Sequence, residues 1–244
     1  MEIYNNILIF DTLSSTNEHA FKIIESNQVK EFTTIYTPNQ TRGKGQRGNS
    51  WLSEPGLNCL FSIILFPKKI PANNQFILSQ AVSVGLLHAL QKYCNNIYIK
   101  WPNDIYINNK KIAGILIENI LLGQNISKSV VGIGLNCNQT IFDESLPNPT
   151  SLALETNKKY DCIEIINECI ESIEKTYVNI DHAKNEIENT YHTALYKRNI
   201  LAQYKDSNGI FDAKIIGVEP TGKLLLQDSY NQLRTYNFKE IEFL

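Results

Sequence analysis

Residues 43–48 read GKGQRG and match the spacing G-x-G-x-x-G of the glycine-rich turn in dinucleotide-binding folds. That turn follows a strand and opens a helix, whose N-terminus holds a pyrophosphate. The residues after Gly48, NSWLSEPG (49–56), have no helical period, and the next regular element is an apolar strand at 57–66. The stretch also lacks the G-x-x-x-x-G-K-[ST] pattern of a P-loop. The sequence therefore excludes both of these nucleotide-binding turns.

What remains is a glycine-rich connection that carries Arg42, Lys44 and Arg47. Glycines let a backbone approach a ligand closely, and their amides can form a nest for an anion. Trp51 follows directly and offers a surface on which a ring can stack. Short glycine-rich loops are also common as flexible surface connections, so this stretch alone leaves both interpretations open.

Three further stretches carry residues of chemical interest. KWPND (100–104) joins a lysine at a strand end to a tryptophan, a proline and an amide–carboxylate pair, although a buried corner and a turn would explain it too. KIAGILIEN (111–119) places Lys111 three residues before Gly114, whose alternative interpretation is a β-bulge. GIGLNCN (132–138) repeats glycine inside a strand. Because strand glycines cost stability, this repeat suggests a ligand packed against the backbone.

The remaining pattern predicts an α+β protein with a mixed sheet and helices packed on it. Strands are expected at residues 4–13, 32–37, 57–66 and 129–138, and the stretch 96–122 is expected to form a strand, a break and then a hairpin turning at Asn108–Asn109. Helices are expected at 14–26 with a capping box from Ser15 to Glu18, at 74–93 with one apolar face, and over 162–197 as one helix or two. From residue 199, short strands and turns recur every 10 to 14 residues, which indicates a small β-barrel.

Composition restricts the class of partner and the compartment. The 244 residues carry a formal net charge of -2, so no strong positive field exists to hold nucleic acid or anionic lipid. No apolar run approaches the about 20 residues that cross a bilayer, and the N-terminus does not resemble a signal peptide. We therefore expect a cytoplasmic protein without a membrane or nucleic-acid partner.

The cysteines are odd in number and lack C-x-x-C spacing. They are Cys59, Cys94, Cys137, Cys162 and Cys169. This pattern argues against a disulfide framework and against a zinc site, so no metal ligands are expected.

SSTN (14–17), NQTRGKGQRGNSW (39–51), KWPND, KIAGILIE (111–118) and GIGLNCN, in this order, resemble the biotin–protein ligases. These enzymes are also called holocarboxylase synthetases or biotin–[acetyl-CoA-carboxylase] ligases. The resemblance covers roughly residues 8–140 by motif and the remainder by layout. It implies a class II synthetase-like catalytic domain at 1–197 that binds biotin and ATP, and a small SH3-like C-terminal barrel at 198–244.

The resemblance also implies an activity. The family activates biotin with MgATP to biotinyl-5′-AMP, releases pyrophosphate, and passes biotin to one lysine of a biotin carboxyl carrier protein. Biotin, ATP and Mg²⁺ are then required, without a permanently bound cofactor. The first strand starts within ten residues of Met1, so we expect the monofunctional class without a DNA-binding domain, as a monomer or homodimer.

Site residues follow from the family motifs. The positions matching the biotin site are Ser15, Thr16, Asn17, Gln40, Lys44, Gly45, Gln46, Lys111 and Gly114. The positions matching the ATP or adenylate site are Arg47, Trp51, Asn103 and Asn136. Catalysis is assigned to Lys111, Lys44 and Asp104, where Asp104 either holds Mg²⁺ through water or orients the acceptor lysine.

Two positions depart from the family pattern. The family usually has arginine where Lys44 stands, and often a second basic residue where Gln46 stands. Lysine keeps the charge but loses the bidentate fork of arginine, so both changes bear on how tightly the loop retains the adenylate.

Two other functions stay open at this point. A lipoate–protein ligase shares the fold and adenylate chemistry, but its substrate has no ureido ring and would not need the SSTN and Gln40 set. A non-catalytic biotin or nucleotide sensor would bind without turnover, although the retention of Lys111, Asp104 and Asn136 argues against it.

The loop at residues 39–50 is expected to be mobile without ligand, because it has three glycines and like charges that repel one another. Ordering it costs about 1–2 kcal/mol per residue, which a bound phosphate would offset. Limited trypsin digestion should cut the free protein at Arg42, Lys44 or Arg47 and spare it when biotin and MgATP are both present. Equal cutting in both samples would show that the loop does not close.

Overall fold

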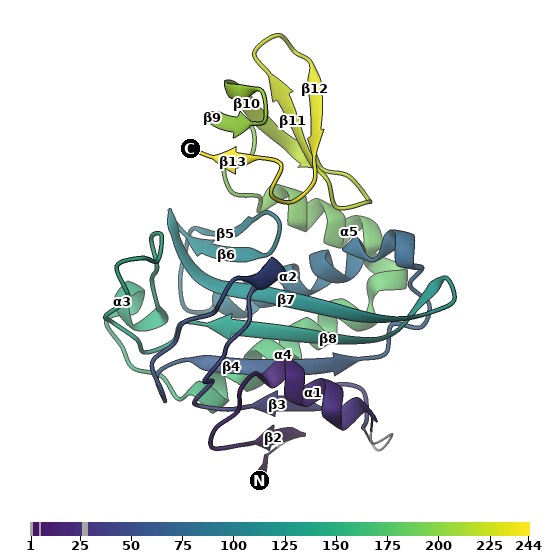
Figure 1. Cartoon of the computed structure of the whole chain (residues 1–244). Helices are drawn as coiled ribbons and strands as arrows, with labels where there is room; N and C mark the ends of the chain where they lie inside the picture. The colour runs from purple at the N-terminus through teal and green to yellow at the C-terminus, as the bar shows by residue number, and fades with distance from the viewer. Residues whose placement is uncertain (1, 5, 26–28) are drawn as a thin grey trace.

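The computed structural model describes residues 2–4, 6–25 and 29–244, which form two β-sheets with helices packed on the larger one (Figure 1). The larger sheet has eight strands, in the spatial order β1 (Glu2–Tyr4), β2 (Ile7–Ile9), β3 (Thr34–Tyr36), β4 (Cys59–Leu65), β8 (Asn125–Leu135), β7 (Lys110–Leu122), β6 (Asp104–Ile107) and β5 (Ile97–Lys100). Among these strands β2 and β3 pair in parallel and the other neighbours antiparallel. The predicted mixed sheet is confirmed.

The central strand β4 is buried on both faces, which explains its unbroken apolar run. Phe61 and Ile63 belong to the main core, which the larger helices cover, whereas Ile64 belongs to a smaller core under α1 (Thr16–Glu25). Side chains alternate along a strand, so Ser62 faces α1 together with Ile64. The face of the sheet beneath the start of α1 is where the polar residues gather.

Helix α2 (Phe76–Leu90) is buried nearly all round, because it contacts β5, α4 (Cys162–Val178) and α5 (Ile180–Thr193). The predicted helix is present, but the prediction that one of its faces is exposed is wrong. Gly85 marks the closest approach, since a Cβ there would lie 2.6 Å from the Ile173 Cα. The remaining short helices are η1 (Gln46–Gly48), η2 (Ala72–Asn74) and α3 (Leu152–Thr156).

The N-terminal segment differs from the predicted single strand at 4–13. It forms the antiparallel pair β1 and β2, and Asn6 between them has φ 67°, a left-handed conformation that turns the chain. The expected capping box is also replaced. The Glu18 carboxylate accepts a hydrogen bond from Ser14 Oγ at 2.7 Å and pairs with Lys44 Nζ at 2.7 Å.

The C-terminal segment forms an open five-stranded antiparallel sheet, so the predicted SH3-like barrel is not confirmed. Its order is β12 (Leu233–Tyr236), β11 (Leu224–Asp228), β10 (Gly209–Val218), β9 (Leu201–Asp206) and β13 (Glu242–Phe243). β12 and β13 are its two edge strands, and each pairs with one neighbour only, β11 or β9, so the sheet does not close. Trp101 ties this sheet to the larger one, because its Nε1 donates to the Gly222 carbonyl at 2.9 Å and its ring contacts Phe238.

Within the described residues, every helix is too short or too polar to cross a lipid bilayer.

Gly85→Ala is expected to destabilise the protein by about 1–3 kcal/mol, because the new methyl group would press on the α4 backbone. Helix propensity alone predicts the opposite sign, since alanine is favoured over glycine by about 1 kcal/mol. Urea unfolding measures the difference. Gly217→Ala is the matched control, as its Cβ would meet His192 at an ordinary 3.6 Å. A stabilised Gly85→Ala variant would contradict this packing.

Candidate functional site

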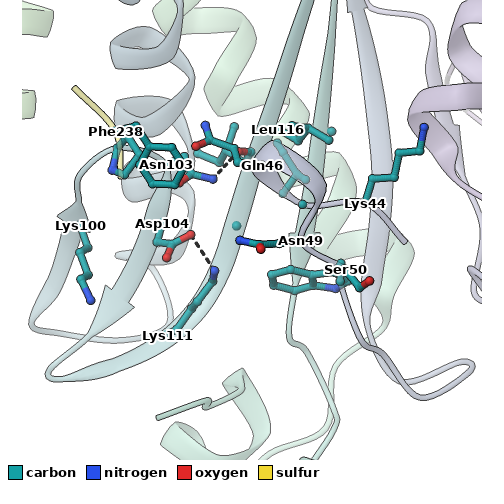
Figure 2. Close-up of a pocket in the computed structure, with 18 of the residues that line it drawn as sticks. Lys44, Gln46, Asn49, Ser50, Lys100, Asn103, Asp104, Lys111, Leu116 and Phe238 are labelled. Atoms are coloured by element: carbon teal, nitrogen blue, oxygen red, sulfur yellow. Dashed lines mark hydrogen bonds and ion pairs between the residues drawn. The ribbon is translucent and has the colours of Figure 1, made fainter. Parts of the chain in front are cut away.

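A cavity of about 710 Å³ lies on the α1 side of the sheet (Figure 2). Five parts of the chain line it: the start of α1, the loop from Gln40 to Trp51, the strands β6, β7 and β8 with the KWPND corner, the segment 145–147, and the C-terminal segment near Phe238. Most of the motifs found in the sequence therefore meet around one space.

The polar end of the cavity is built from the SSTN motif and the loop. Thr16 donates from its backbone N and its Oγ1 to Gln40 Oε1, at 2.8 and 3.2 Å. Asn17 donates from Nδ2 to Glu118 Oε2 at 2.7 Å, while Ser62 Oγ donates to Asn17 Oδ1 at 2.6 Å. Buried polar groups need such partners. Ser15, Thr16 and Asn17 are each almost fully buried, and this network holds Thr16 and Asn17 in fixed orientations.

Ser62 was missed by the sequence reasoning. Its hydroxyl lies 2.7 Å from Thr16 Oγ1 and is fully buried at the centre of the polar network. The available signal was a single polar residue within the apolar strand CLFSIIL.

Lys111 and Asp104 form an ion pair at the opposite side, with Nζ 2.7 Å from Oδ1 (Figure 2). They share a face of the sheet because of a bulge: Tyr106 pairs with Lys111 and Ile105 with Ala113, which leaves one extra residue in β7. In a regular strand, residues three positions apart point to opposite faces, so without the bulge Lys111 would point away from the face of Gly114. The backbone of Lys111 is also fixed, since its N donates to Asn148 O and its carbonyl accepts from Thr150 N.

Asn103 fastens the KWPND corner to β7. Its Nδ2 donates to the Ile115 carbonyl at 2.8 Å, and its own carbonyl accepts from Ile115 N at 2.9 Å. Asn103 lines the cavity. Its side-chain amide is bonded to β7, however, and this bond positions the next residue, Asp104. The predicted contact of Asn103 with the nucleotide stays a prediction.

Trp51 lies flat over the strand glycines. A Cβ at Gly114 would come within 2.8 Å of Trp51 Cζ3, and a Cβ at Gly134 would overlap the indole. Gly132 gives the same close approach to Asn17. The glycine repeat had suggested a ligand against the backbone; in this structure two side chains of the protein occupy those positions. Trp51 Nε1 is buried without a hydrogen-bond partner, and Lys111 Nζ lies 5.5 Å from the ring centroid.

The loop from Arg42 to Trp51 has a defined turn. Gly45 N donates to Asn49 O, and Trp51 N to Gly43 O. Lys44 points away from Lys111 and towards α1 (Figure 2), where its ammonium holds the pKa of Glu18 below its ordinary value. Gly45 and Gln46 line the cavity, and their predicted contact with biotin stays a prediction. Lys44 is a lining residue too, but its ammonium is engaged by Glu18, away from Lys111.

Of two further predicted residues, Asn136 is placed away from the cavity and Arg47 has no described side chain. Asn136 is buried behind the cavity wall, where its Nδ2 donates to the Thr150 carbonyl at 2.9 Å and its N to Ile112 O. Asn136 thereby holds the segment 148–150, which hydrogen-bonds the backbone of Lys111. Its predicted contact with the nucleotide stays untested. Arg47 belongs to η1, and its side chain lies outside the described part of the chain.

Lys100 and the C-terminal segment were not predicted as site residues. Lys100 Nζ donates to Tyr106 Oη at 3.0 Å, and burial lowers the pKa of its ammonium. Phe238 and Lys239, in the turn between β12 and β13, and Phe243 of β13 line the same cavity. The leading lysine of KWPND was the one sequence signal for Lys100, whereas nothing local distinguishes the C-terminal residues.

The geometry agrees with the comparisons. Residues 9–136, about half of the chain, match the model of the Biotin/lipoate A/B protein ligase family. The chain belongs to this family. The bifunctional ligase/repressor BirA of Bacillus subtilis is 29% identical over 242 residues, which cover 97% of this chain and 74% of that protein. The biotin–[acetyl-CoA-carboxylase] ligase of Paracoccus denitrificans is 27% identical over 87% of this chain and 90% of its own.

A solved structure has the same fold as this chain over nearly the whole length of both proteins. The biotin protein ligase of Aquifex aeolicus, determined in complex with biotin and ATP, superposes with a TM-score of 0.81 and covers 99% of both chains at 24% identity.

Gly134→Ala is expected to drive the indole of Trp51 off the sheet and shift its fluorescence emission to longer wavelength, as the ring becomes more exposed. Trp101, the other tryptophan, is buried in the junction between the sheets and supplies a constant background. Gly217→Ala should leave the emission unchanged, since its Cβ meets no closer atom than 3.6 Å. An unshifted Gly134→Ala spectrum would contradict the packing of Trp51.

Proposed function

We propose that the protein is an ATP-dependent biotin–protein ligase, which activates biotin to biotinyl-5′-AMP with release of pyrophosphate and then transfers biotin to a lysine of a biotin carboxyl carrier protein. The observation that carries the proposal is one cavity with a neutral polar end, at Thr16, Asn17 and Gln40, and a cationic side at Lys111. Membership of the ligase family supports it independently.

Biotin matches this division of the cavity. Its ureido ring is neutral and polar and needs fixed donors and acceptors, which the hydrogen-bonded start of α1 and Gln40 supply. Its carboxylate is an anion and belongs near Lys111. Ser15, Gly45, Gln46 and Gly114 line the same cavity. We assign ATP to the side of the cavity bounded by Trp51, Asn103 and the C-terminal residues.

Lys111 is the residue on which the first step depends. A carboxylate that attacks an α-phosphate brings two anions together, and a positioned cation lowers the energy of the transition state. Lys111 enters already oriented, because Asp104 holds its ammonium and two backbone hydrogen bonds hold its main chain. When the ammonium turns to the reacting anions, Asp104 is free for a second task such as orienting the acceptor lysine.

Mg²⁺ would come with ATP and offset the charge of its phosphates. The residues present fit that ion, because Mg²⁺ takes oxygen donors and keeps several waters while bound through few carboxylates. Asp104 is the carboxylate that lines the cavity beside Lys111. We propose it as the group that would hold Mg²⁺, directly or through water.

The loop from Arg42 to Trp51 would exclude water from the mixed anhydride, which is easily hydrolysed. Lys44 is available for this step because its ion pair with Glu18 is substantially exposed, and such pairs contribute only about 0.2–1 kcal/mol. An incoming phosphate can therefore replace Glu18 as its partner. We also propose residues 1–197 as the catalytic unit and 198–244 as an appended one.

Lipoate is the competing substrate, because the family description includes lipoate ligases. A lipoate ligase has no use for donors and acceptors arranged around a ureido ring. The hydrogen-bonded set at Thr16, Asn17, Gln40 and Ser62 therefore favours biotin.

Pyrophosphate release from ATP tests the function and the role of Lys111 together. The wild-type chain should release pyrophosphate with biotin and not with lipoate. Lys111→Ala should lower the biotin-dependent rate by about a hundredfold or more, the usual effect of removing one group that stabilises a developing anion. The variant should stay folded, because Lys111 is part-exposed at a cavity wall.

Lys110→Ala is the matched control. Its ammonium is exposed and lies 3.9 Å from Glu155, outside the cavity, so its rate should equal that of the wild type. Release with lipoate alone would replace biotin by lipoate, and no release with either acid would favour a binding protein without turnover. An unimpaired Lys111→Ala variant would remove Lys111 from the mechanism.

A further inference from the structure

Three cysteines that are far apart in the sequence meet inside the protein. The Sγ atoms of Cys59, Cys137 and Cys162 all lie within 4.8 Å of one another. Cys59 is the first residue of β4, Cys137 follows the end of β8, and Cys162 is the first residue of α4. The three thiols therefore join two strands and a helix at one point.

The cluster lies on the face of the sheet opposite the cavity. Cys59 and Cys137 are fully buried and belong to the main core with Phe61 and Leu135. Gly134 faces the cavity, and the residues that alternate with it face the core. Cys162 is only partly buried, so it is the thiol through which a small ion can reach the other two.

The sulfurs are nearly placed for a three-coordinate ion. With metal–sulfur bonds of about 2.3 Å, a trigonal site holds its sulfurs about 4 Å apart, so each needs to move by less than an ångström. Within the described residues, the cluster contains no fourth ligand atom from cysteine, histidine, aspartate or glutamate. The neighbouring Asp161 carboxylate caps α4 by accepting from Ile163 N at 2.7 Å.

The surroundings favour a thiolate at Cys162. The start of a helix carries a partial positive charge, and Asn138 Nδ2 donates to Cys162 Sγ at 3.9 Å. Hydrogen bonding from Cys137 and Cys59 lowers the pKa of Cys162, whereas burial raises the pKa of Cys59. These groups agree with the geometry, on which the assignment rests.

We propose that Cys59, Cys137 and Cys162 form a binding site for one soft d¹⁰ metal ion of the Cu(I) class. Three thiolates without a further donor suit a soft monovalent ion, whereas Zn²⁺ prefers four ligands in a tetrahedron. On binding, each thiol protonated beforehand releases its proton to solvent as its sulfur bonds the ion, and the oxidation state of the metal does not change. The bound ion links β4, β8 and α4.

Anaerobic titration of the reduced, full-length chain with Cu(I), buffered by the chromophoric chelator bicinchoninate, tests the site. The wild type should retain one Cu(I) per chain and show an ultraviolet thiolate-to-copper charge-transfer band. Cys162→Ser should bind at least about a hundredfold more weakly, since removing a ligand costs no less than removing its supporting contacts.

Cys94→Ser is the matched control, because Cys94 is also partly buried but lies outside the cluster. It should bind Cu(I) as the wild type does. Serine suits the first turn of a helix, so Cys162→Ser should fold, and its thermal unfolding with its pyrophosphate release would establish that it does.

X-ray absorption of copper in the wild-type complex gives a second measurement that needs no variant. Three sulfur neighbours would support the site, while two sulfurs or a nitrogen and oxygen shell would overturn it. Equal retention by wild type and Cys162→Ser, or equal loss in Cys94→Ser, would also overturn the proposal. Tighter binding of Zn²⁺ than of Cu(I) would refute the choice of ion.

Discussion

The cavity depends on three positions without side chains. Gly114, Gly132 and Gly134 lie on one face of β7 and β8, and a Cβ at any of them would meet Asn17 or Trp51. Because glycine has no side chain, α1 and the loop from Arg42 to Trp51 pack directly on the backbone of the sheet. That approach brings Thr16 and Asn17 to Ser62, and it sets Trp51 beside Lys111. A larger residue at these strand positions would separate the two halves of the site.

Two cation–carboxylate pairs at the cavity differ in exposure, and the difference matters for their roles. Lys111 and Asp104 have side-chain exposures of 30% and 20%, whereas Lys44 and Glu18 have 48% and 35%. Screening by water weakens the more exposed pair. Lys44 is therefore the cation that changes partner at little cost, while Lys111 is held in place. A fixed cation suits the reacting centre, and an exchangeable one suits a loop that closes.

Sequence reasoning identified the elements whose pattern is local. The apolar run of β4, the hairpin at Asn108–Asn109 and the strand with repeated glycines all carry their signal within a few residues. It was less successful where burial came from another element. The face of α2 that was expected to be exposed is covered by α4 and α5. The short C-terminal strands form an open sheet, and the expected barrel is not confirmed.

The sequence by itself determined the order of the motifs, and with it the family, because each motif is a contiguous set of residues. Only the tertiary structure decided which side chains meet. One extra residue in β7 places Lys111 on the face of Gly114. Phe238 reaches the cavity from the turn between β12 and β13, Ser62 completes the polar network, and three cysteines without characteristic spacing come together. The contacts of Phe238, Ser62 and the three cysteines join residues far apart along the chain. Such contacts depend on strand register and on the packing of whole elements, which local patterns of polarity do not specify.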